Sequence, residues 1–199
     1  FSGVGKGTLM KLLTERYGQY ALSISATTRD PREGEQDGRE YFFRKKEEFE
    51  KLIENDELLE YASYCGNYYG TPKAYVEDQM AQGRDVILEI ELQGALKIKE
   101  KRPDTFLVYV MPPDARTLVD RLTNRGTETP EKVHERLTRA LEEADEVSKY
   151  EFVVINDDLD QSADELHQLI QVQHNKIDKN LEFISQVQRE LKAYLKGEQ

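Results

Sequence analysis

The segment FSGVGKGT, residues 1–8, decides the fold, because it predicts a phosphate-binding loop that leads into a helix over residues 6–17. Its small residues let successive backbone N–H groups turn toward an anion, since no β-carbon obstructs the approach. The positive end of the helix points at the same place, and Lys6 adds a mobile charge for a β- or γ-phosphate. The alternative is a glycine-rich turn before an ordinary helix, because the usual first glycine of the pattern would precede Phe1.

Composition and charge limit the class of protein. The chain has 199 residues, 38% hydrophobic and 34% charged, which suits one domain with a solvated surface. A formal net charge of −11 argues against general binding to nucleic acid or to an anionic membrane. The single cysteine, Cys65, excludes an intrachain disulfide and a thiolate zinc site, and we expect it to pack rather than react. No apolar run reaches membrane-spanning length and no signal peptide precedes the loop, so a cytoplasmic location is expected.

Strand-like and helix-like segments alternate along the chain. Residues 85–90, 105–110 and 152–155 are nearly continuous apolar runs, which are typical of strands buried on both faces of a parallel sheet. Thr71-Pro72 and Thr129-Pro130 are each expected to open a helix, with Thr as the cap and Pro in the first turn. The pattern predicts an α/β protein, a three-layer domain with a parallel core sheet.

Three segments depart from this alternation. Residues 25–70 hold short β-like runs rich in aromatic residues and predict an inserted lobe. Residues 121–136 are rich in glycine, threonine and charge and predict a mobile flap. Beyond residue 164 the chain is helical and polar, with a thin apolar stripe that consists of Ile177, Leu181, Ile184, Val187, Leu191 and Leu195. We expect the stripe to pack on the body, and a seam between two copies, hence a possible homo-oligomer, is the alternative.

The segment TTRDPREGE, residues 27–35, carries two arginines on either side of a proline that stiffens the loop. Arg29 and Arg32 can both direct their planar guanidinium groups at one phosphate, with a bidentate geometry that lysine lacks. The alternative is a charged surface loop, with ion pairs to Glu33 and Glu35.

Further candidates come from short polar segments. In GNYYGT, residues 66–71, tyrosine hydroxyls can donate to an anion, although an ordinary aromatic turn fits equally well. Glu89 and Glu91 end an apolar run, where open α/β sheets place ligands and where carboxylates can hold water around Mg²⁺; simple solvation of a strand end is the alternative.

The flap and the histidines are less specific. The flap arginines, Arg121, Arg125 and Arg136, can neutralise charge during phosphoryl transfer, or they can be surface charges. The histidines are not at metal-ligand spacing, and we expect all three on the surface: His134, His167 and His174.

In combination these motifs resemble the bacterial guanylate kinases, a family of P-loop nucleoside monophosphate kinases. The resemblance runs from Phe1 to about Leu159 and rests on SGVGKGT (2–8), TTRDPREGE (27–35), GNYYGT (66–71), RGTET (125–129) and INDD (155–158). It implies Mg²⁺-dependent transfer of the ATP γ-phosphoryl group to GMP, giving GDP and ADP in purine nucleotide metabolism. It also implies a strand and a glycine ahead of Phe1, so that the chain would be part of a longer product.

The resemblance further implies a division of the chain. The expected parts are core (1–24), GMP-binding lobe (25–70), core (71–120), lid (121–136), core (137–174) and C-terminal helical extension (175–199). Gly7 stands where many relatives have Ser, and Glu89 where many have Asp; the Gly-Lys-Gly-Thr form is shared by some bacterial members and is not taken as inactivating.

Site residues follow from the same resemblance. ATP would contact Ser2, Gly3, Val4, Gly5, Lys6, Gly7, Thr8, Arg121 and Asn156, with Thr8 near Mg²⁺ and partly acting through water. GMP would contact Ser25, Arg29, Arg32, Tyr41, Glu60, Tyr69, Thr71 and Glu89. The catalytic set would be Lys6, Arg29, Arg125 and Arg136. Glu60 can accept from the guanine N1–H and 2-amino groups, whereas adenine offers neither donor and would leave the carboxylate unpaired.

Two other functions remain compatible with the sequence. The first is a guanylate-kinase-like interaction module without catalysis; such modules tend to lose the loop lysine or the lid arginines, and this chain keeps Lys6, Arg125 and Arg136. The second is a kinase for adenylate, thymidylate or a sugar phosphate, which a substrate panel would distinguish.

Overall fold

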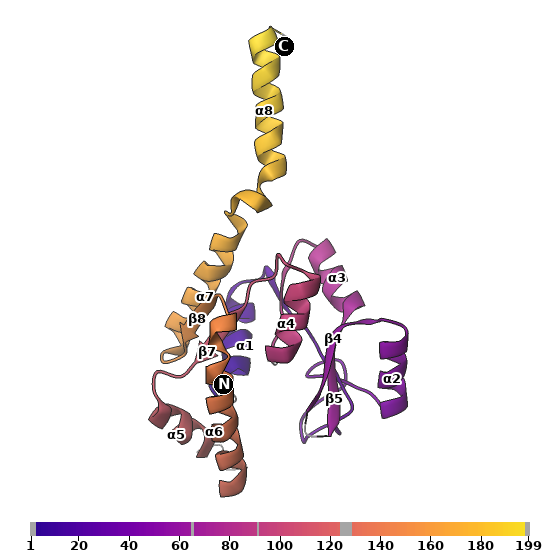
Figure 1. The fold of residues 1–199 in the computed structure, drawn as a ribbon, viewed down its shortest axis with the longest axis vertical. Helices are drawn as coiled ribbons and strands as arrows, with labels where there is room; N and C mark the ends of the chain where they lie inside the picture. Colours follow the sequence, from indigo (N-terminus) through magenta and orange to yellow (C-terminus); the bar gives the residue numbers. More distant parts are fainter. Residues whose placement is uncertain (1–2, 65, 91, 124–128, 198–199) are drawn as a thin grey trace.

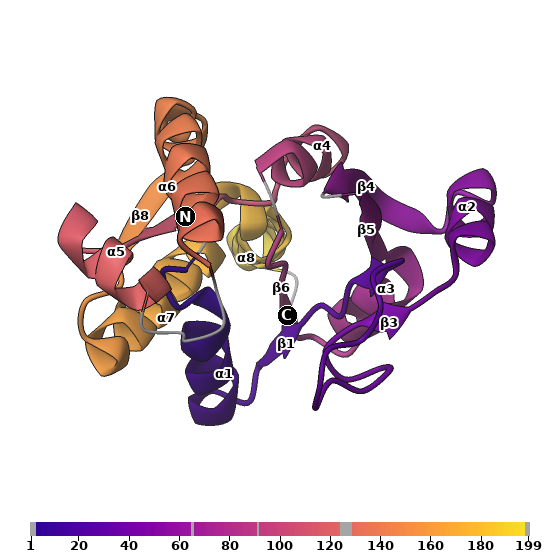
Figure 2. The same ribbon diagram turned by 90° about the horizontal axis from the view of Figure 1, so that it is seen from below.

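The computed structural model describes residues 3–64, 66–90, 92–123 and 129–197. Helices and strands are distributed over two halves (Figure 1), and the pair β1–β6 lies between them (Figure 2). The helices are α1 (Lys6–Arg16), α2 (Lys46–Glu54), α3 (Lys73–Ala81), α4 (Leu92–Lys101), α5 (Ala115–Thr123), α6 (Pro130–Asp145), α7 (Leu159–His174) and α8 (Leu181–Lys196), with 3₁₀ turns η1 (Val147–Lys149) and η2 (Ile177–Lys179). The strands are β1 (Tyr20–Leu22), β2 (Ala26–Thr27), β3 (Phe42–Phe43), β4 (Leu58–Tyr64), β5 (Asn67–Pro72), β6 (Asp85–Ile87), β7 (Val108–Met111) and β8 (Phe152–Ile155).

Parallel pairing defines the first half of the fold. Strand β1 pairs with β6 from Tyr20↔Asp85, and β7 pairs with β8 from Val108↔Phe152, both in parallel. Parallel neighbours need long crossovers, and helices supply them, so the predicted mixed α/β class with parallel strands is confirmed. The predicted single core sheet is not seen: over the described ranges the two pairs are separate, with no ladder between β6 and β7.

The main core packs α1 and α7 against the β7–β8 pair. Leu9 and Leu13 lie one helical turn apart on the same face of α1 and are fully buried, together with Val154 of β8 and Ala163 of α7. Each fully buried aliphatic side chain contributes about 1.5–3 kcal/mol relative to its exposure. This packing fixes α1, and with it the loop at the start of α1.

The second half is a four-stranded sheet in the order β3-β2-β5-β4. Strands β4 and β5 form an antiparallel hairpin, and β5 also pairs with β2. Helix α2 covers this sheet with Phe49, which is fully buried, packs with Ala26 and Leu58, and stacks on Tyr68 at 5.3 Å between ring centroids. The sheet therefore has its own small core, separate from that of the α1 half.

The two threonine–proline pairs behave differently. Thr129 caps α6 as predicted, since its side chain accepts a hydrogen bond from the Lys132 backbone N–H and Pro130 is the first helical residue. The matching prediction for Thr71 is wrong. Pro72 precedes α3, whereas Thr71 belongs to β5, where its hydroxyl donates to Glu60 instead of capping a helix.

The C-terminal helix α8 extends away from the rest of the chain (Figure 1). None of its residues is buried, and the exposed stripe includes Leu181, Leu191 and Leu195, the last 88% exposed. The prediction that this stripe packs on the body is therefore wrong, because α8 diverges from α7 after the η2 turn. A seam between two copies remains a prediction. Over the described ranges, each helix is too short or too polar to cross a lipid bilayer.

Candidate active site

The phosphate-binding segment begins with two glycines in the left-handed region. Gly3 and Gly5 have φ of 88° and 86°, values that a residue with a β-carbon rarely adopts. Gly5 occupies the N-cap of α1, and its carbonyl accepts from the Leu9 backbone N–H at 3.0 Å. Between the two glycines, Val4 is completely buried and fastens the loop to the core.

Two residues that the family resemblance assigns to ATP hold the backbone of this loop. Asn156 Nδ2 donates to the Val4 carbonyl at 2.7 Å, and Arg121 donates to the same oxygen at 3.3 Å. Arg121 also donates to the Asn156 carbonyl at 2.7 Å. The predicted ATP-side residues are thus neighbours of the loop, and in this structure they position it. Ser2 lies outside the described residues.

The first turn of α1 carries Lys6, Gly7 and Thr8. Lys6 is half-buried, whereas Gly7 and Thr8 are exposed. The carboxylate of Glu89 borders this turn, since Oε2 lies 3.9 Å from where a β-carbon on Gly7 would be. Glu89 follows β6, so it connects the phosphate-binding turn to the carboxyl end of a parallel pair.

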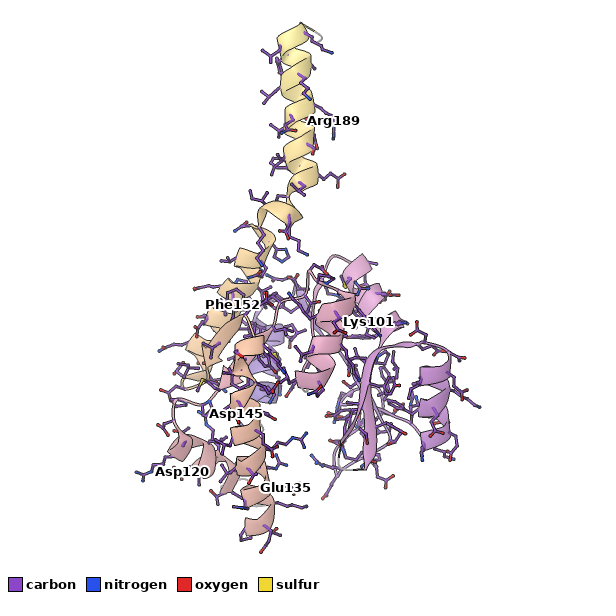
Figure 3. All side chains as sticks on the ribbon, in the orientation of Figure 1. Lys101, Asp120, Glu135, Asp145, Phe152 and Arg189 are labelled. Carbon is purple, nitrogen blue, oxygen red and sulfur yellow. The ribbon has the colours of Figure 1, made fainter. Side chains whose placement is uncertain are left out.

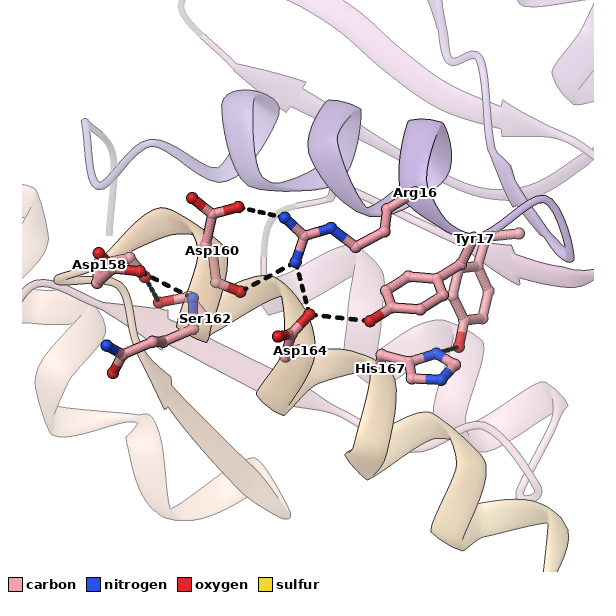
Figure 4. Close-up of polar contacts among 9 residues, drawn as sticks. Arg16, Tyr17, Asp158, Asp160, Ser162, Asp164 and His167 are labelled. Carbon is pink, nitrogen blue, oxygen red and sulfur yellow. Dashed lines mark hydrogen bonds and ion pairs between the residues drawn. The ribbon is translucent and has the colours of Figure 1, made fainter.

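A polar network that no motif of the sequence predicted fastens the opposite end of α1 to α7 (Figure 4). Arg16 forms ion pairs with Asp160 and, at 2.6 Å, with Asp164, and the Tyr17 hydroxyl donates to Asp164 at 2.9 Å. These hydrogen bonds, first from Tyr17 and then from Arg16, lower the pKa of Asp164. Helix α1 is therefore held at both ends.

His167 belongs to the same network, which corrects the prediction of a surface histidine. Its ring stacks on Tyr17 with 3.8 Å between centroids, and Nδ1 lies 2.6 Å from the Tyr20 hydroxyl. His174 agrees better with the prediction, because it is about half exposed, although Nε2 pairs with Asp85 at 2.9 Å. Over the described ranges, acidic, histidine and cysteine side chains do not gather in groups of three that suit a metal ion.

The second constellation lies across the four-stranded sheet, and we call it the carboxylate row: Ser25, Glu60 and Thr71. Glu60 is opposite Thr71 in the β4–β5 ladder, and the Thr71 hydroxyl donates to Oε1 at 2.8 Å. The antiparallel β2–β5 register comprises Ala26↔Gly70 and Thr27↔Tyr69, and Ser25 directly precedes β2, so the same register extended by one residue would bring position 25 opposite Thr71. Residues opposite one another in neighbouring strands share a face, so the register aligns the row on one side of the sheet.

Burial determines the electrostatics of the carboxylate row. Glu60 is 5% exposed and Thr71 is fully buried. Burial raises the pKa of Glu60, while the Thr71 hydrogen bond and the charges of Lys97 and Lys101 offset part of that rise. A buried carboxylate with spare acceptor capacity is arranged to receive hydrogen bonds from a ligand that has N–H donors.

The third constellation surrounds Arg29, and we call it the arginine cluster: Arg29, Glu35, Tyr41, Phe43 and Tyr69. Two guanidinium hydrogen bonds reach Glu35, at 3.0 Å to Oε1 and 2.9 Å to Oε2, and both side chains are about one-sixth exposed. The guanidinium carbon lies 5.3 Å from the centre of the Tyr41 ring and 5.7 Å from that of Phe43. Desolvation lowers the pKa of Arg29, but the Glu35 hydrogen bond and charge raise it more, so the group stays cationic.

Arg32 does not join Arg29 in the structure. Its residue is exposed, and only its backbone N–H reaches the cluster, donating to Glu35 Oε2 at 2.7 Å. The alternative of an ion pair with Glu35 therefore describes Arg29, although this pair is largely buried rather than on the surface. Glu35 was predicted only as a partner in a surface ion pair, yet it accepts from both the Arg29 side chain and the Arg32 backbone.

A cavity of about 550 Å³ opens beside these groups and is lined by Tyr41, Glu89, Ser23, Arg39 and Arg84, among others. Burial raises the pKa of Tyr41, and the neighbouring Tyr69 and Glu89 add to the rise. The cavity therefore adjoins both the arginine cluster and the carboxylate that borders the phosphate-binding turn.

The structure describes two of the three flap arginines. Arg121 lies in α5 and Arg136 lies half-buried in α6, while Arg125 is outside the described residues, as are Cys65 and Glu91. Residues 121–123 and 130–136 are helical, so the described parts of the predicted flap are ends of α5 and α6.

Comparison with known proteins shows the family of the chain. The sequence model of the guanylate kinase family matches residues 1–173. The chain belongs to the guanylate kinase family. It is 45% identical over 189 residues to the guanylate kinase of Caldanaerobacter subterraneus subsp. tengcongensis, covering 95% of this chain and 92% of that protein. It is 48% identical over 169 residues to the guanylate kinase of Desulfitobacterium hafniense, covering 85% and 84%.

A solved structure supports the same membership. The crystal structure of guanylate kinase from Anaplasma phagocytophilum superimposes with a TM-score of 0.70 at 31% identity, and the match covers 85% of this chain and 82% of that chain. The guanylate kinase matches thus extend over both halves of the fold, including the phosphate-binding turn, the carboxylate row and the arginine cluster.

Proposed function

We propose that the protein is an ATP:GMP phosphotransferase, which transfers the γ-phosphoryl group of ATP to GMP and gives GDP and ADP. Membership of the guanylate kinase family supports this activity. Within the chain, the observation that carries it is the buried Glu60–Thr71 pair. A carboxylate that is already desolvated and anchored suits a base with two adjacent N–H donors, which guanine has and adenine lacks.

In this proposal, the carboxylate row reads guanine and the arginine cluster holds the GMP phosphate. Arg29, Tyr41 and Tyr69 would contact the phosphate, with Arg32 swinging in from its exposed position. Arg29 would have to share or leave its bonds to Glu35, and a phosphate dianion is a strong enough acceptor to compete for it. Tyr41 and Glu89 line one cavity, and Arg29 lies over the Tyr41 ring, which supports a single acceptor site.

On the donor side, the loop amides from residues 2–8 and Lys6 would hold the ATP phosphates. Arg121 and Asn156 would act by shaping the loop, because they bind the Val4 carbonyl in this structure. Thr8, with Glu89 acting through water, offers the oxygen donors that Mg²⁺ accepts alongside phosphate oxygens, and the ion would neutralise charge on the phosphates. The acceptor oxygen of GMP is already ionised at neutral pH, so the residues contribute alignment and positive charge rather than a general base.

We also propose the division of labour that the sequence suggests. Residues 25–70, which hold most of the four-stranded sheet, would serve as the GMP lobe, and residues 121–136 as a lid that brings Arg125 and Arg136 to the transferring group. Closure of both parts would exclude water, which would otherwise hydrolyse ATP. The stable separate core of the lobe, around Phe49, suits a unit that moves as a body.

A coupled assay for ADP production tests the proposal. The protein would be mixed with ATP and Mg²⁺, and GMP, AMP, dTMP and a sugar phosphate would be added in separate reactions. Of these four acceptors, we expect rapid turnover only with GMP. Glucose 6-phosphate provides the sugar-phosphate control. Equal rates with AMP and GMP would contradict the guanine-reading role of Glu60, and an absence of turnover with every acceptor would favour a non-catalytic interaction module.

A further inference from the structure

Helix α4 contacts the strand that carries Glu60 through two lysines. Lys97 Nζ donates to the Tyr61 carbonyl at 3.0 Å, and Lys101 Nζ donates to the Leu59 carbonyl at 2.7 Å. The lysines are four residues apart, so they project from the same face of α4 (Lys101 is labelled in Figure 3). Their acceptors immediately precede and follow Glu60 in β4.

These carbonyls belong to the outer edge of the sheet. Strand β4 is the last strand in the order β3-β2-β5-β4, and alternate carbonyls of a strand face opposite sides. Leu59 lies at the register shift between Leu58 and Glu60 and has no partner in the β4–β5 ladder, and the carbonyls of residues 59 and 61 accept from α4 instead. Because two lysines from one helix satisfy them, α4 holds β4 on both sides of Glu60.

A glycine completes the contact. Gly94, in the first turn of α4, is buried against the Glu60 side chain, and a β-carbon there would lie 2.6 Å from Oε2 and 3.0 Å from Cδ. Such a distance is below van der Waals contact, so any side chain at position 94 would displace the carboxylate or α4. Glu60 is thus confined by Thr71 on one oxygen and by the backbone of α4 on the other.

We propose that α4 positions the guanine-reading carboxylate, with Lys97 and Lys101 clamping β4 around Glu60 and Gly94 leaving the space that the carboxylate occupies. This inference rests on the proposed function, because it takes Glu60 as the group that reads the base. Gly94, Lys97 and Lys101 are positioning residues: they act through Glu60 and need not touch GMP. Together they extend the determinants of base selectivity from the lobe to the helix that follows β6.

Electrostatics gives the lysines a second effect. In the described part of the chain, the charged groups that act on Glu60 are Lys97 and Lys101, both from α4, and Thr71 of β5 adds a neutral donor. Both lysines counteract the rise in the pKa of Glu60 that burial causes. They therefore favour the ionised form, which is the form that accepts two N–H groups.

The test uses the double variant Lys97→Met/Lys101→Met, which keeps side-chain length and removes donors and charge. Lys99→Met is the matched control, because Lys99 lies on the same helix but bonds to Thr105 and Glu151 instead of β4. We expect the double variant to raise KM and the calorimetric Kd for GMP about tenfold, with KM for ATP changed less than about twofold. The lowest pH at which GMP still binds should also rise in the double variant. Lys99→Met should leave the GMP affinity and this pH limit unchanged.

Restoring the donors is the next step. Lys97→Arg/Lys101→Arg should recover most of the GMP affinity. A loss of thermal stability with GMP Kd and its pH profile unchanged would overturn the clamp, and so would an equal effect of Lys99→Met. If the wild-type protein binds GMP but produces no ADP, the proposed function fails while the binding measurements still test the clamp.

Gly94→Ala tests the steric part separately. We expect it to raise the Kd for GMP about tenfold by displacing the Glu60 carboxylate. In a Glu60→Asp background, the shorter side chain withdraws from position 94, so adding Gly94→Ala should have little further effect. Additive losses in the two variants would overturn the steric role of Gly94.

Discussion

The carboxylate row and the arginine cluster differ in how far each is prepared for a ligand. In the carboxylate row, Glu60 is buried and anchored by Thr71, and its remaining acceptor capacity has no charged competitor among the described side chains within hydrogen-bonding distance. In the arginine cluster, Arg29 is already bonded to both oxygens of Glu35. The carboxylate row would therefore bind the base without rearrangement, whereas the arginine cluster would exchange the Glu35 carboxylate for the phosphate.

Substitution of Lys6, on the ATP side, should have the strongest effect on turnover and should separate substrate binding from phosphoryl transfer. Lys6→Ala should lower kcat about a thousandfold, because it removes a full charge from the transferring phosphates. GMP binding should stay nearly intact, since Lys6 lies at the start of α1 and outside the carboxylate row and arginine cluster. Steady-state kinetics together with GMP calorimetry check this, and unchanged turnover would reject the assignment of the loop.

Glu60→Gln replaces the carboxylate of the carboxylate row by an amide of nearly the same shape. The amide presents a donor to a guanine N–H, so kcat/KM for GMP should fall about a hundredfold. KM for ATP should change little, because the ATP phosphates are assigned to the loop and Lys6. Measuring KM for both substrates decides the matter, and an equal loss for ATP and GMP would argue against the guanine-reading role.

Arg29→Met and Arg32→Met compare a buried and an exposed arginine in the same loop. Arg29 should be the more important, with about a thirtyfold rise in KM for GMP, because its desolvated guanidinium interacts strongly with a phosphate. Arg32→Met should raise KM only about fivefold, since an exposed charge is screened by solvent. The reverse ranking would show that the phosphate binds away from the arginine cluster.

The pH dependence of Glu60 gives the smallest effect and separates stability from binding. Its pKa is raised by burial, so the folded protein holds this proton more tightly than the unfolded chain. The free energy of unfolding therefore receives a contribution that is present below the unfolded pKa and is lost as the pH rises through the raised value. Glu60→Gln removes the buried charge, so its Tm should exceed that of the wild type by a few degrees near neutral pH, in the range of about 2–4 °C, and by less under acidic conditions.

GMP affinity should have the opposite dependence on pH, because GMP requires the ionised carboxylate. The affinity should fall as the pH falls through the raised pKa of Glu60. Thermal melts and GMP calorimetry over the same pH series measure both trends. A Tm difference between Glu60→Gln and the wild type that does not vary with pH would contradict a buried, titrating carboxylate.

The sequence predicted most of the secondary structure because its signals were local. Thr129-Pro130 predicts a helix start, which is present, and the predicted glycine-rich loop before Lys6 contains two glycines with positive φ. Thr71-Pro72 carries the same local signal, but there a long-range partner prevails: the buried Glu60 needs a donor, and Thr71 supplies it. Local preference therefore failed where burial imposed a stronger requirement.

The arrangement of the site depended on contacts that no local pattern encodes. The bonds from Arg121 and Asn156 to Val4, and from Lys97 and Lys101 to β4, join segments far apart in the chain. The apolar stripe of α8 indicated a buried face, yet amphipathic periodicity cannot say which surface covers it, and the body does not. Residue types could thus be proposed from the sequence, while their partners required the fold.

A crystal structure of the protein with GMP is the most direct test of the contrast between the two constellations. We expect Glu60 to keep its bond to Thr71 and to accept from the guanine N1–H and 2-amino groups, while Arg29 turns from Glu35 toward the phosphate. A complex in which Glu60 leaves Thr71 and faces solvent, with the Arg29–Glu35 pair intact and the phosphate bound elsewhere, would contradict this expectation.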